Sequence, residues 1–228
     1  MAEEKPLLSI QNVKKVFKTR DGELEALGDV SFDVHSGEFI SIVGPSGCGK
    51  TTILKIVAGL LAKSAGAIHV DEKQFDPTRD VGFVFQAASL LPWRSVLDNV
   101  LLPIEILRMD KAAMKTKAAE LLGLVGLRDF EDSYPNELSG GMQQRVSIAR
   151  ALIHDPKLLL MDEPFGALDA ITRERMNLEL LRIWRESKKT IIFVTHDINE
   201  ALFLSDRVIV LSARPSQMVL ALDIHLPR

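Results

Sequence analysis

The segment Gly44-Pro-Ser-Gly-Cys-Gly-Lys50-Thr51 constrains the fold of this chain more than any other feature. It follows the β-branched run Phe39–Val43 and precedes a stretch with helical spacing that begins at Lys50. Glycines let a backbone curl so that several N–H groups point inward at one anion. A helix that begins beside them adds the partial positive charge of its N-terminus. The order of strand, glycine loop and helix therefore predicts a phosphate-binding loop at the edge of an α/β sheet.

The last residues of this loop predict what it binds. Lys50 can reach the β- and γ-phosphates of a nucleoside triphosphate, and the Thr51 hydroxyl can ligate Mg²⁺. The alternative is a glycine-rich turn followed by a chance Lys-Thr pair. Cys48 either fills a permitted position or, beside a helix N-terminus, is a reactive thiol whose alkylation would block the loop. The residues expected to contact the nucleotide here are Gly44, Pro45, Ser46, Gly47, Cys48, Gly49, Lys50, Thr51 and Thr52.

A second strand brings carboxylates to the same edge. Leu158-Leu-Leu-Met-Asp162-Glu163 is an apolar run that ends in two acids. In open α/β sheets, ligands bind at the carboxyl ends of the strands. Asp162 is therefore expected to ligate Mg²⁺, and Glu163 to polarise the attacking water as a general base. The alternative is a strand that simply ends in solvent-exposed acids.

The remaining pattern alternates strands and helices, which predicts a mainly parallel sheet covered on both sides. We expect a P-loop NTPase core with an N-terminal antiparallel β subdomain, and with a helical subdomain inserted at about 88–155 of a single domain, 1–228. Strand patterns lie within 7–43 and at 81–85, 158–161, 191–194 and 207–211, and helical patterns at 50–60, 111–124, 170–187 and 198–205. On the last long helix, Ile171, Leu178, Leu181 and Trp184 share one face.

Composition narrows the class of partner. The formal net charge is -3 over 228 residues, so no excess of positive charge exists to hold a nucleic-acid backbone, and no such partner is expected. The one cysteine, Cys48, excludes an internal disulfide and fits a reducing compartment. The acidic N-terminal residues do not resemble a signal peptide, and we expect no membrane-spanning segment.

Six motifs in order resemble those of the ABC ATPase family. Leu138-Ser-Gly-Gly-Met142-Gln-Gln-Arg145 is similar to its signature motif. The others are the phosphate loop, Gln86 after a strand, the acid strand, Ala167-Leu168-Asp169 and Thr195-His196-Asp197. The resemblance covers essentially the whole chain and implies ATP hydrolysis by two paired copies.

The resemblance also implies roles for single residues. Ser139, Gly140 and Gly141 would bind the γ-phosphate held by the other copy, while Ser139 also caps its helix. Gln86 would sense Mg²⁺ and the attacking water, although it could be a solvated loop residue. His196 would contact the γ-phosphate and hold Glu163, unless it is purely structural. Asp169 would reach across the dimer. The implied catalytic residues are Glu163, His196 and Lys50, and the implied metal-binding residues are Thr51, Gln86 and Asp162.

Two positions depart from the family pattern. Phe17 aligns with the aromatic residue that stacks on adenine, where tyrosine is common; a core phenylalanine is the competing interpretation. Stacking needs only the ring face. Met142 replaces the more usual glutamine of the signature. Because Ser139 and backbone amides bind the anion, activity is expected to survive this change.

One segment indicates what the ATPase drives. Leu90-Leu-Pro-Trp93-Arg-Ser-Val-Leu-Asp-Asn-Val100 resembles the nitrate/sulfonate/taurine branch of ABC importers, as does Pro164-Phe-Gly-Ala-Leu-Asp169 more generally. The resemblance implies a membrane permease contacted near Gln86–Trp93, an external substrate-binding protein, and a peripheral location on the cytoplasmic face of the inner membrane. Alternatively, Trp93 packs inward on the helices.

Two other functions compete with transport. One is a non-transport ABC ATPase that acts on a cytosolic macromolecular complex, but such proteins usually carry coiled coils or tandem cassettes. The other is a nucleotide-gated module without catalysis, which the presence of Glu163 and His196 disfavours.

Overall fold

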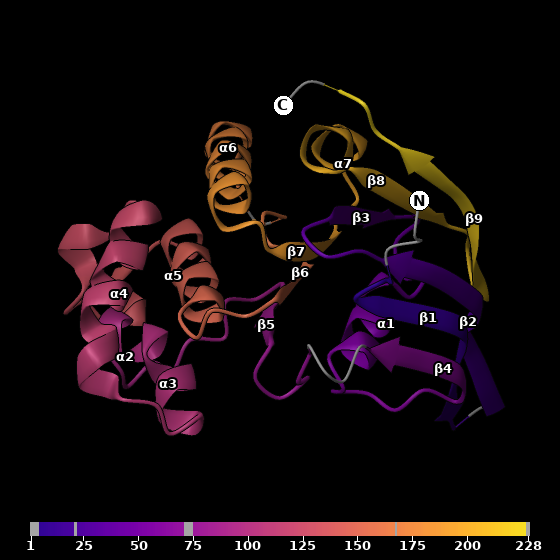
Figure 1. Ribbon diagram of the computed structural model, residues 1–228, viewed down its shortest axis with the longest axis horizontal. Helices are drawn as coiled ribbons and strands as arrows, with labels where there is room; N and C mark the ends of the chain where they lie inside the picture. The colour runs from indigo at the N-terminus through magenta and orange to yellow at the C-terminus, as the bar shows by residue number, and fades with distance from the viewer. Residues whose placement is uncertain (1–4, 21, 71–74, 167, 227–228) are drawn as a thin grey trace.

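A single sheet organises the molecule. The computed structural model describes residues 5–20, 22–70, 75–166 and 168–226. Within these residues nine strands follow the order β4-β1-β2-β9-β8-β3-β7-β6-β5 (Figure 1). The half from β8 to β5 is parallel, and the half from β4 to β2 is antiparallel. The predicted α/β class with an added antiparallel part is confirmed.

Buried, mostly apolar runs form the parallel strands. Every residue of β3, β6 and β7 is buried, which is why these segments lack polar alternation. Helix α1 (Lys50–Val57) packs on one face of this half, and α5 (Gly140–Leu152) and α6 (Ala170–Ser187) pack on the other. The parallel strands are β3 (Phe39–Val43), β5 (Val81–Val84), β6 (Leu158–Asp162), β7 (Thr190–Val194) and β8 (Arg207–Leu211).

Outside the parallel half, the sheet contains two strands that sequence patterns did not predict. Strands β1 (Leu8–Thr19) and β2 (Gly22–Val34) form the hairpin expected within 7–43. Strands β4 (Ala65–Val70) and β9 (Ser216–Asp223) are mostly exposed or half-buried, so they lack the buried alternation that reveals a strand. Strand β9 pairs with β8 on one side and β2 on the other, and thereby joins the two halves.

A cluster of helices lies beside β5 and β6 (Figure 1). It has an apolar core of its own, in which Val100, Ile104 and Leu122 are fully buried. Residues 88–95, where the helical insertion was expected to begin, form a loop instead. The helices are α2 (Val96–Val100), α3 (Leu102–Ile106), α4 (Lys111–Leu124) and α5, with short 3-10 turns at 128–130 and 135–137.

Two helix predictions need correction. Helix α1 was expected to reach Leu60 but ends at Val57, because Gly59 turns the chain with a φ of 70°. On α6, Ile171 and Leu178 are 74% and 53% exposed, although they share a helical face with buried Leu181. Helix α7 (Ile198–Leu204) lies nearly where it was expected.

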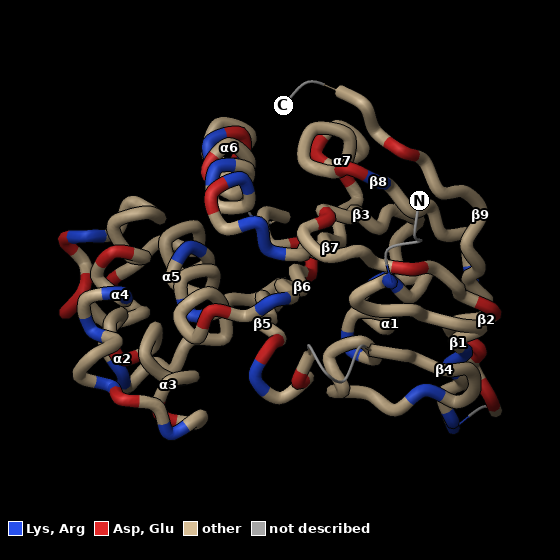
Figure 2. Tube along the Cα trace, in the orientation of Figure 1, with Lys and Arg blue, Asp and Glu red and all other residues tan. Residues whose placement is uncertain are grey.

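The surface charge is mixed. Acidic and basic residues are interleaved along α6 (Figure 2), in keeping with a net charge of -3. No helix among the described residues is both long enough and apolar enough to span a bilayer.

Candidate functional site

The loop between β3 and α1 curls around its own lysine. Gly49 caps α1 with a φ of 107°, and a Cβ at this position would lie 2.7 Å from a Leu27 methyl carbon, so only glycine fits. Lys50 is 5% exposed, and its ammonium group donates to the carbonyl oxygens of Gly44 (2.8 Å) and Pro45 (3.1 Å). The loop thus holds the Lys50 ammonium group close to its own backbone, where a phosphate bound by the loop would meet it.

The loop and the acid strand meet at Thr51. Its hydroxyl donates to Oδ1 of buried Asp162 over 2.9 Å. Burial raises the pKa of the Asp162 carboxyl; the Thr51 hydrogen bond opposes this effect. Oxygen ligands of this kind suit Mg²⁺, whose shell is commonly completed by water and phosphate. In the described ranges, no group of three or more His, Cys, Asp or Glu could hold a metal ion.

Two polar side chains converge on Glu163. Its Oε2 lies 3.4 Å from Nε2 of Gln86 and 3.3 Å from Nδ1 of His196. The three residues follow β5, β6 and β7, and parallel pairing of these neighbours brings them to one edge. Glu163 has a φ of 46°, a left-handed conformation that costs about 1–3 kcal/mol and persists only where the surroundings fix it. A carboxylate held this way can accept a proton from water.

A cleft of about 200 Å³ opens beside Lys50. Phe17 and Glu163 both border it, so the residues expected at the base and at the γ-phosphate share one cavity. Phe17 is half-buried, with the Lys15 ammonium 4.9 Å from its ring centroid, and it is therefore not a core residue. Arg214 also lines the cleft. No sequence pattern indicated Arg214, because only the pairing of β9 with β8 and β2 brings it there.

The Cys48 side chain lies beneath the phosphate loop. It is 1% exposed and belongs to the apolar core. Of the two interpretations of this residue, its burial favours the permitted position over the reactive thiol. Any contact between Cys48 and a phosphate is made by its backbone.

The Ser139 segment lies outside the cleft. Ser139 caps α5 by accepting a hydrogen bond from the Met142 amide (3.3 Å), and a Cβ on Gly140 would meet no atom within 4 Å. Figure 1 shows α5 and α1 on either side of β6, and none of the cleft-lining residues comes from α5. In one copy of the chain, the residues expected to bind phosphate therefore form two separate surfaces.

Asp169 caps α6 beside this segment. Its carboxylate accepts a hydrogen bond from the Thr172 amide (3.0 Å), and this contact lowers the pKa of the Asp169 carboxyl. A Cβ on Gly141 would lie 2.9 Å from a Leu168 methyl carbon, so the turn before α6 abuts the start of α5. Ala167, the first residue of this motif, lies outside the described residues. Asp169 is exposed and accessible to another chain.

Trp93 stands on a loop that is fixed from inside. Its side chain is 72% exposed, so the interpretation that it packs inward is wrong. Buried Asn99 accepts a hydrogen bond from the Leu91 amide (2.8 Å) and donates to the carbonyl oxygens of Leu91 and Arg94 (both 3.1 Å). An exposed indole on a fixed loop is typical of a protein-partner surface. The same segment borders a groove of about 370 Å³ lined by Phe83, Phe85, Ser89, Leu102, Ile106 and His154, among others.

Comparison with known proteins identifies the family. The sequence profile of a family described as ABC transporter matches residues 27–166. This span contains the phosphate loop, Gln86, the Ser139 segment and the acid strand. The chain belongs to the ABC transporter family. The resemblance proposed from six motifs is therefore confirmed.

Relatives in the ABC transporter family match nearly the whole chain. It is 46% identical to an aliphatic sulfonates import ATP-binding protein SsuB of Bacillus cereus, over 96% of this chain and 87% of the relative. It is 49% identical to a taurine import ATP-binding protein TauB of Yersinia pestis, over 88% and 79% respectively. An uncharacterized ABC transporter ATP-binding protein of Methanocaldococcus jannaschii is 47% identical over 97% and 84%.

Solved ABC transporter cassettes share the fold. The dimeric structure of the bacterial cassette MJ0796 superposes with a TM-score of 0.85 at 36% identity, covering 96% of this chain and 100% of that one. A dimeric post-hydrolysis state of the same cassette, bound to ADP and Pi, gives a TM-score of 0.82 at 33% identity, with the same coverage. The expected cassette fold is confirmed.

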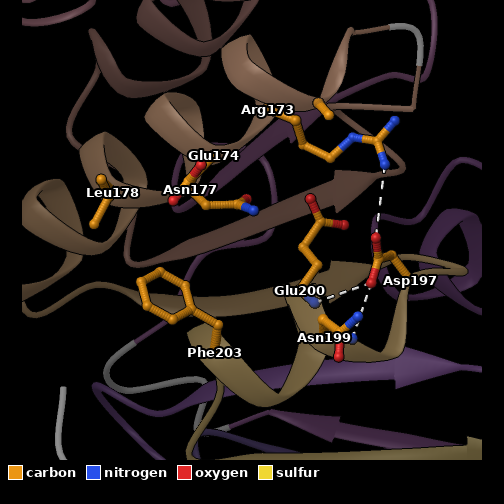
Figure 3. A pocket seen from close by; sticks show the side chains of 9 residues that line it. Arg173, Glu174, Asn177, Leu178, Asp197, Asn199, Glu200 and Phe203 are labelled. Atoms are coloured by element: carbon orange, nitrogen blue, oxygen red, sulfur yellow. Dashed lines mark hydrogen bonds and ion pairs between the residues drawn. The ribbon is translucent and has the colours of Figure 1, made fainter.

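A pocket of about 440 Å³ lies between α6 and α7 of this ABC transporter chain, with Asp197 in its lining (Figure 3). Arg173 crosses one end of it, donating to the Leu168 carbonyl (3.0 Å) and pairing with Asp197 (3.6 Å). Buried Glu200 lies beside them, and burial raises the pKa of its carboxyl. The turn before α6 and the turn after β7 are thus tied together.

Proposed function

We propose that this chain hydrolyses ATP as the nucleotide-binding subunit of an ABC importer, and that two copies close around ATP to drive a separate permease. The observation that carries this proposal is the convergence of Gln86 and His196 on Glu163, at the border of a cleft that contains the phosphate loop. A module that only bound nucleotide would need no carboxylate held in this way.

The cleft accommodates the nucleotide from base to γ-phosphate. Adenine stacks on the half-buried Phe17 ring, and the backbone amides of residues 46–52 surround the phosphates. Lys50, already oriented by the loop carbonyls, neutralises charge on the β- and γ-phosphates. Thr51 and Asp162, with Gln86 nearby, would hold Mg²⁺, which supplies charge neutralisation during phosphoryl transfer.

Hydrolysis requires a water molecule aligned with the γ-phosphate. Glu163 accepts a proton from that water as the nucleophile attacks. His196 and Gln86 contact the same carboxylate oxygen and fix its direction. Lys50 stabilises the negative charge that spreads over the transferring phosphoryl group.

A second copy supplies the groups that one copy keeps apart. The exposed glycine tip at Ser139, Gly140 and Gly141 opens a helix, so its amides and dipole favour an anion. We assign it to the γ-phosphate held by the other copy, with exposed Asp169 also at the dimer contact. One solved cassette of the same fold is dimeric in two structures, which supports this assembly. ATP then favours the closed pair, because only that state contacts it from both sides.

Import is supported by the relatives and by the Trp93 loop. Proteins named for sulfonate and taurine import are 46% and 49% identical to this chain. We infer a permease that covers Trp93 and the adjacent groove, and an external substrate-binding protein that delivers nitrate, a sulfonate, taurine or a similar small solute. We therefore propose a peripheral location on the cytoplasmic face of the inner membrane.

The test is capture of the permease from native membranes by a tagged chain. Trp93→Ala should reduce the recovered permease at least 10-fold, because an exposed aromatic anchor can dominate an interface. The matched control is Ile171→Ala, which removes an exposed apolar side chain from a different element, α6. This variant should recover the permease as fully as the wild type does. Capture of a cytosolic complex instead of a membrane protein would favour the non-transport ATPase.

A further inference from the structure

Arg214 is a cation beside the phosphate loop to which the mechanism above gives no role. It lines the same cleft as Lys50 and Thr51. Its Nη2 lies 2.8 Å from where a Cβ on Gly47 would be, so the guanidinium sits directly against the loop backbone. No carboxylate of the described residues pairs with it. An unpaired arginine against a loop that binds anions is well placed to bind an anion itself.

The position of Arg214 is set by an anchored turn. Residues 212–215 join β8 to β9, and the Ser212 amide donates to the carbonyl of Gln217 at the start of β9 (3.0 Å). The Gln217 amide returns a hydrogen bond to the Ser212 hydroxyl (3.0 Å). Ser216 is fully buried, and its hydroxyl donates to the carbonyl oxygens of Cys48 and Ala26. Because Cys48 belongs to the phosphate loop, the turn and the loop are joined directly.

We propose that Arg214 is a further nucleotide-binding residue, whose guanidinium donates to the α- and β-phosphate oxygens. Ala26, to which the turn is anchored, lines the cleft and lies two residues after Leu24, the β2 partner of Phe17, where the base is expected. The nearest phosphates are then those that ATP and ADP have in common. This inference rests on the proposed function and adds a contact to the same site.

The contact is exposed to solvent, which limits its strength. Arg214 is an exposed residue, unlike Lys50, so water and salt screen its charge. Removing the guanidinium should therefore weaken binding of ADP and ATP by about 10-fold each. Lysine at the same position keeps the charge but loses the planar fork, and should weaken both by about 3-fold.

Calorimetric titration with ADP, ATP and adenosine tests the proposal. EDTA in every sample withholds the divalent cation needed for hydrolysis. Arg214→Gln and Arg214→Lys are compared with Arg185→Gln, which removes the same charge from the exposed surface of α6. We expect the two Arg214 variants to lose ADP and ATP affinity equally, the control to match wild type, and adenosine binding to be unchanged in all.

Three results would overturn the role of Arg214 alone: unchanged ADP affinity in Arg214→Gln, a loss confined to ATP, or an equal loss for adenosine. Failure of the wild-type protein to bind either nucleotide would instead refute the proposed function. Thermal unfolding of each variant shows whether the fold is intact, and Arg214→Lys gives a second measurement if the glutamine variant is unstable.

Discussion

The two anion-binding surfaces of this chain differ in how completely one copy builds them. In the phosphate-loop cleft, Lys50 donates hydrogen bonds to loop carbonyl oxygens, and Thr51 donates one to Asp162. At the Ser139 tip, Gly140 faces open space, and the cap to Met142 is the contact that shapes the turn. Contacts within one copy preorganise the first surface. The second surface is open, and a single copy holds no phosphate next to it.

This difference separates binding from hydrolysis. A preorganised cleft can bind nucleotide in a single copy, because its donors are in place beforehand. Hydrolysis requires charge stabilisation on every side of the γ-phosphate, and one copy leaves one side open. The ATP-bound state that drives a partner is therefore a property of the pair.

Glu163→Gln should separate the two steps with the largest effect. Loss of a general base typically lowers turnover by about 10²–10⁴-fold. ATP binding should remain, because glutamine keeps the shape of the side chain and Lys50 is untouched. Phosphate release measures the loss, and light scattering should show dimers accumulating with ATP. Glu120→Gln, an exposed change on α4, is the control; a glutamine variant that turned over at the wild-type rate would exclude Glu163 as the base.

The two anion-binding surfaces can also be disabled separately, each by a substitution in a different copy of the chain. Lys50→Ala disables the cleft and Ser139→Glu places a negative charge at the tip, so each variant alone should lose at least about 100-fold in activity. In an equal mixture, random pairing should restore about a quarter of the wild-type sites, because half of the dimers then hold one intact site. A mixture as inactive as its components would contradict a site shared between copies.

The convergence on Glu163 was predictable from sequence for a physical reason. Gln86, Glu163 and His196 each follow an apolar run, and parallel strands with continuous burial must end at one edge of the sheet. Their place at one edge was therefore expected from the strands, whereas the contact of His196 with Glu163 was expected from the family resemblance. The open Ser139 tip was likewise expected from the family resemblance.

Other parts of the site depend on strand pairings and side-chain contacts that no local sequence pattern predicts. Strand β9 is exposed along most of its length, so neither it nor the approach of Arg214 to Gly47 was visible in the sequence. Cys48 stands next to glycines in an anion loop, yet the loop turns its side chain into the core. The loop that carries exposed Trp93 is held by side-chain hydrogen bonds from Asn99 to its backbone, which follow no periodic pattern.

Asn99→Ala should show that the Trp93 loop is fixed from inside. The change leaves the Leu91 amide and the Leu91 and Arg94 carbonyls without their partner, which should lower the free energy of unfolding by about 2–4 kcal/mol. Urea unfolding followed by circular dichroism measures this loss. Asn136→Ala removes an exposed asparagine and should be neutral. Equal stability of the two variants would mean that the loop holds its shape without Asn99.

Asp162→Asn should have the smallest effect on stability, in the opposite direction. Burial raises the pKa of the Asp162 carboxyl above its ordinary 3.8, so the folded protein holds this proton more tightly than the unfolded chain does. The carboxyl group therefore contributes its full stabilisation of the folded state below a pH of about 3.8. This stabilisation is lost as the pH rises through the pKa of the group in the folded protein. At neutral pH the buried carboxylate opposes folding.

Asparagine removes this charge and can still accept the Thr51 hydrogen bond. Without nucleotide, the variant should be more stable than wild type by about 1 kcal/mol at pH 7.5, and the gain should shrink as the pH falls toward 4. Urea unfolding at a series of pH values measures it, with Asp129→Asn as an exposed control. Its ATPase activity should be lost, because a neutral amide is a poor ligand for Mg²⁺. If the variant were less stable than wild type at every pH, the Asp162 carboxylate would stabilise the fold. The prediction that it destabilises the fold at neutral pH would then be wrong.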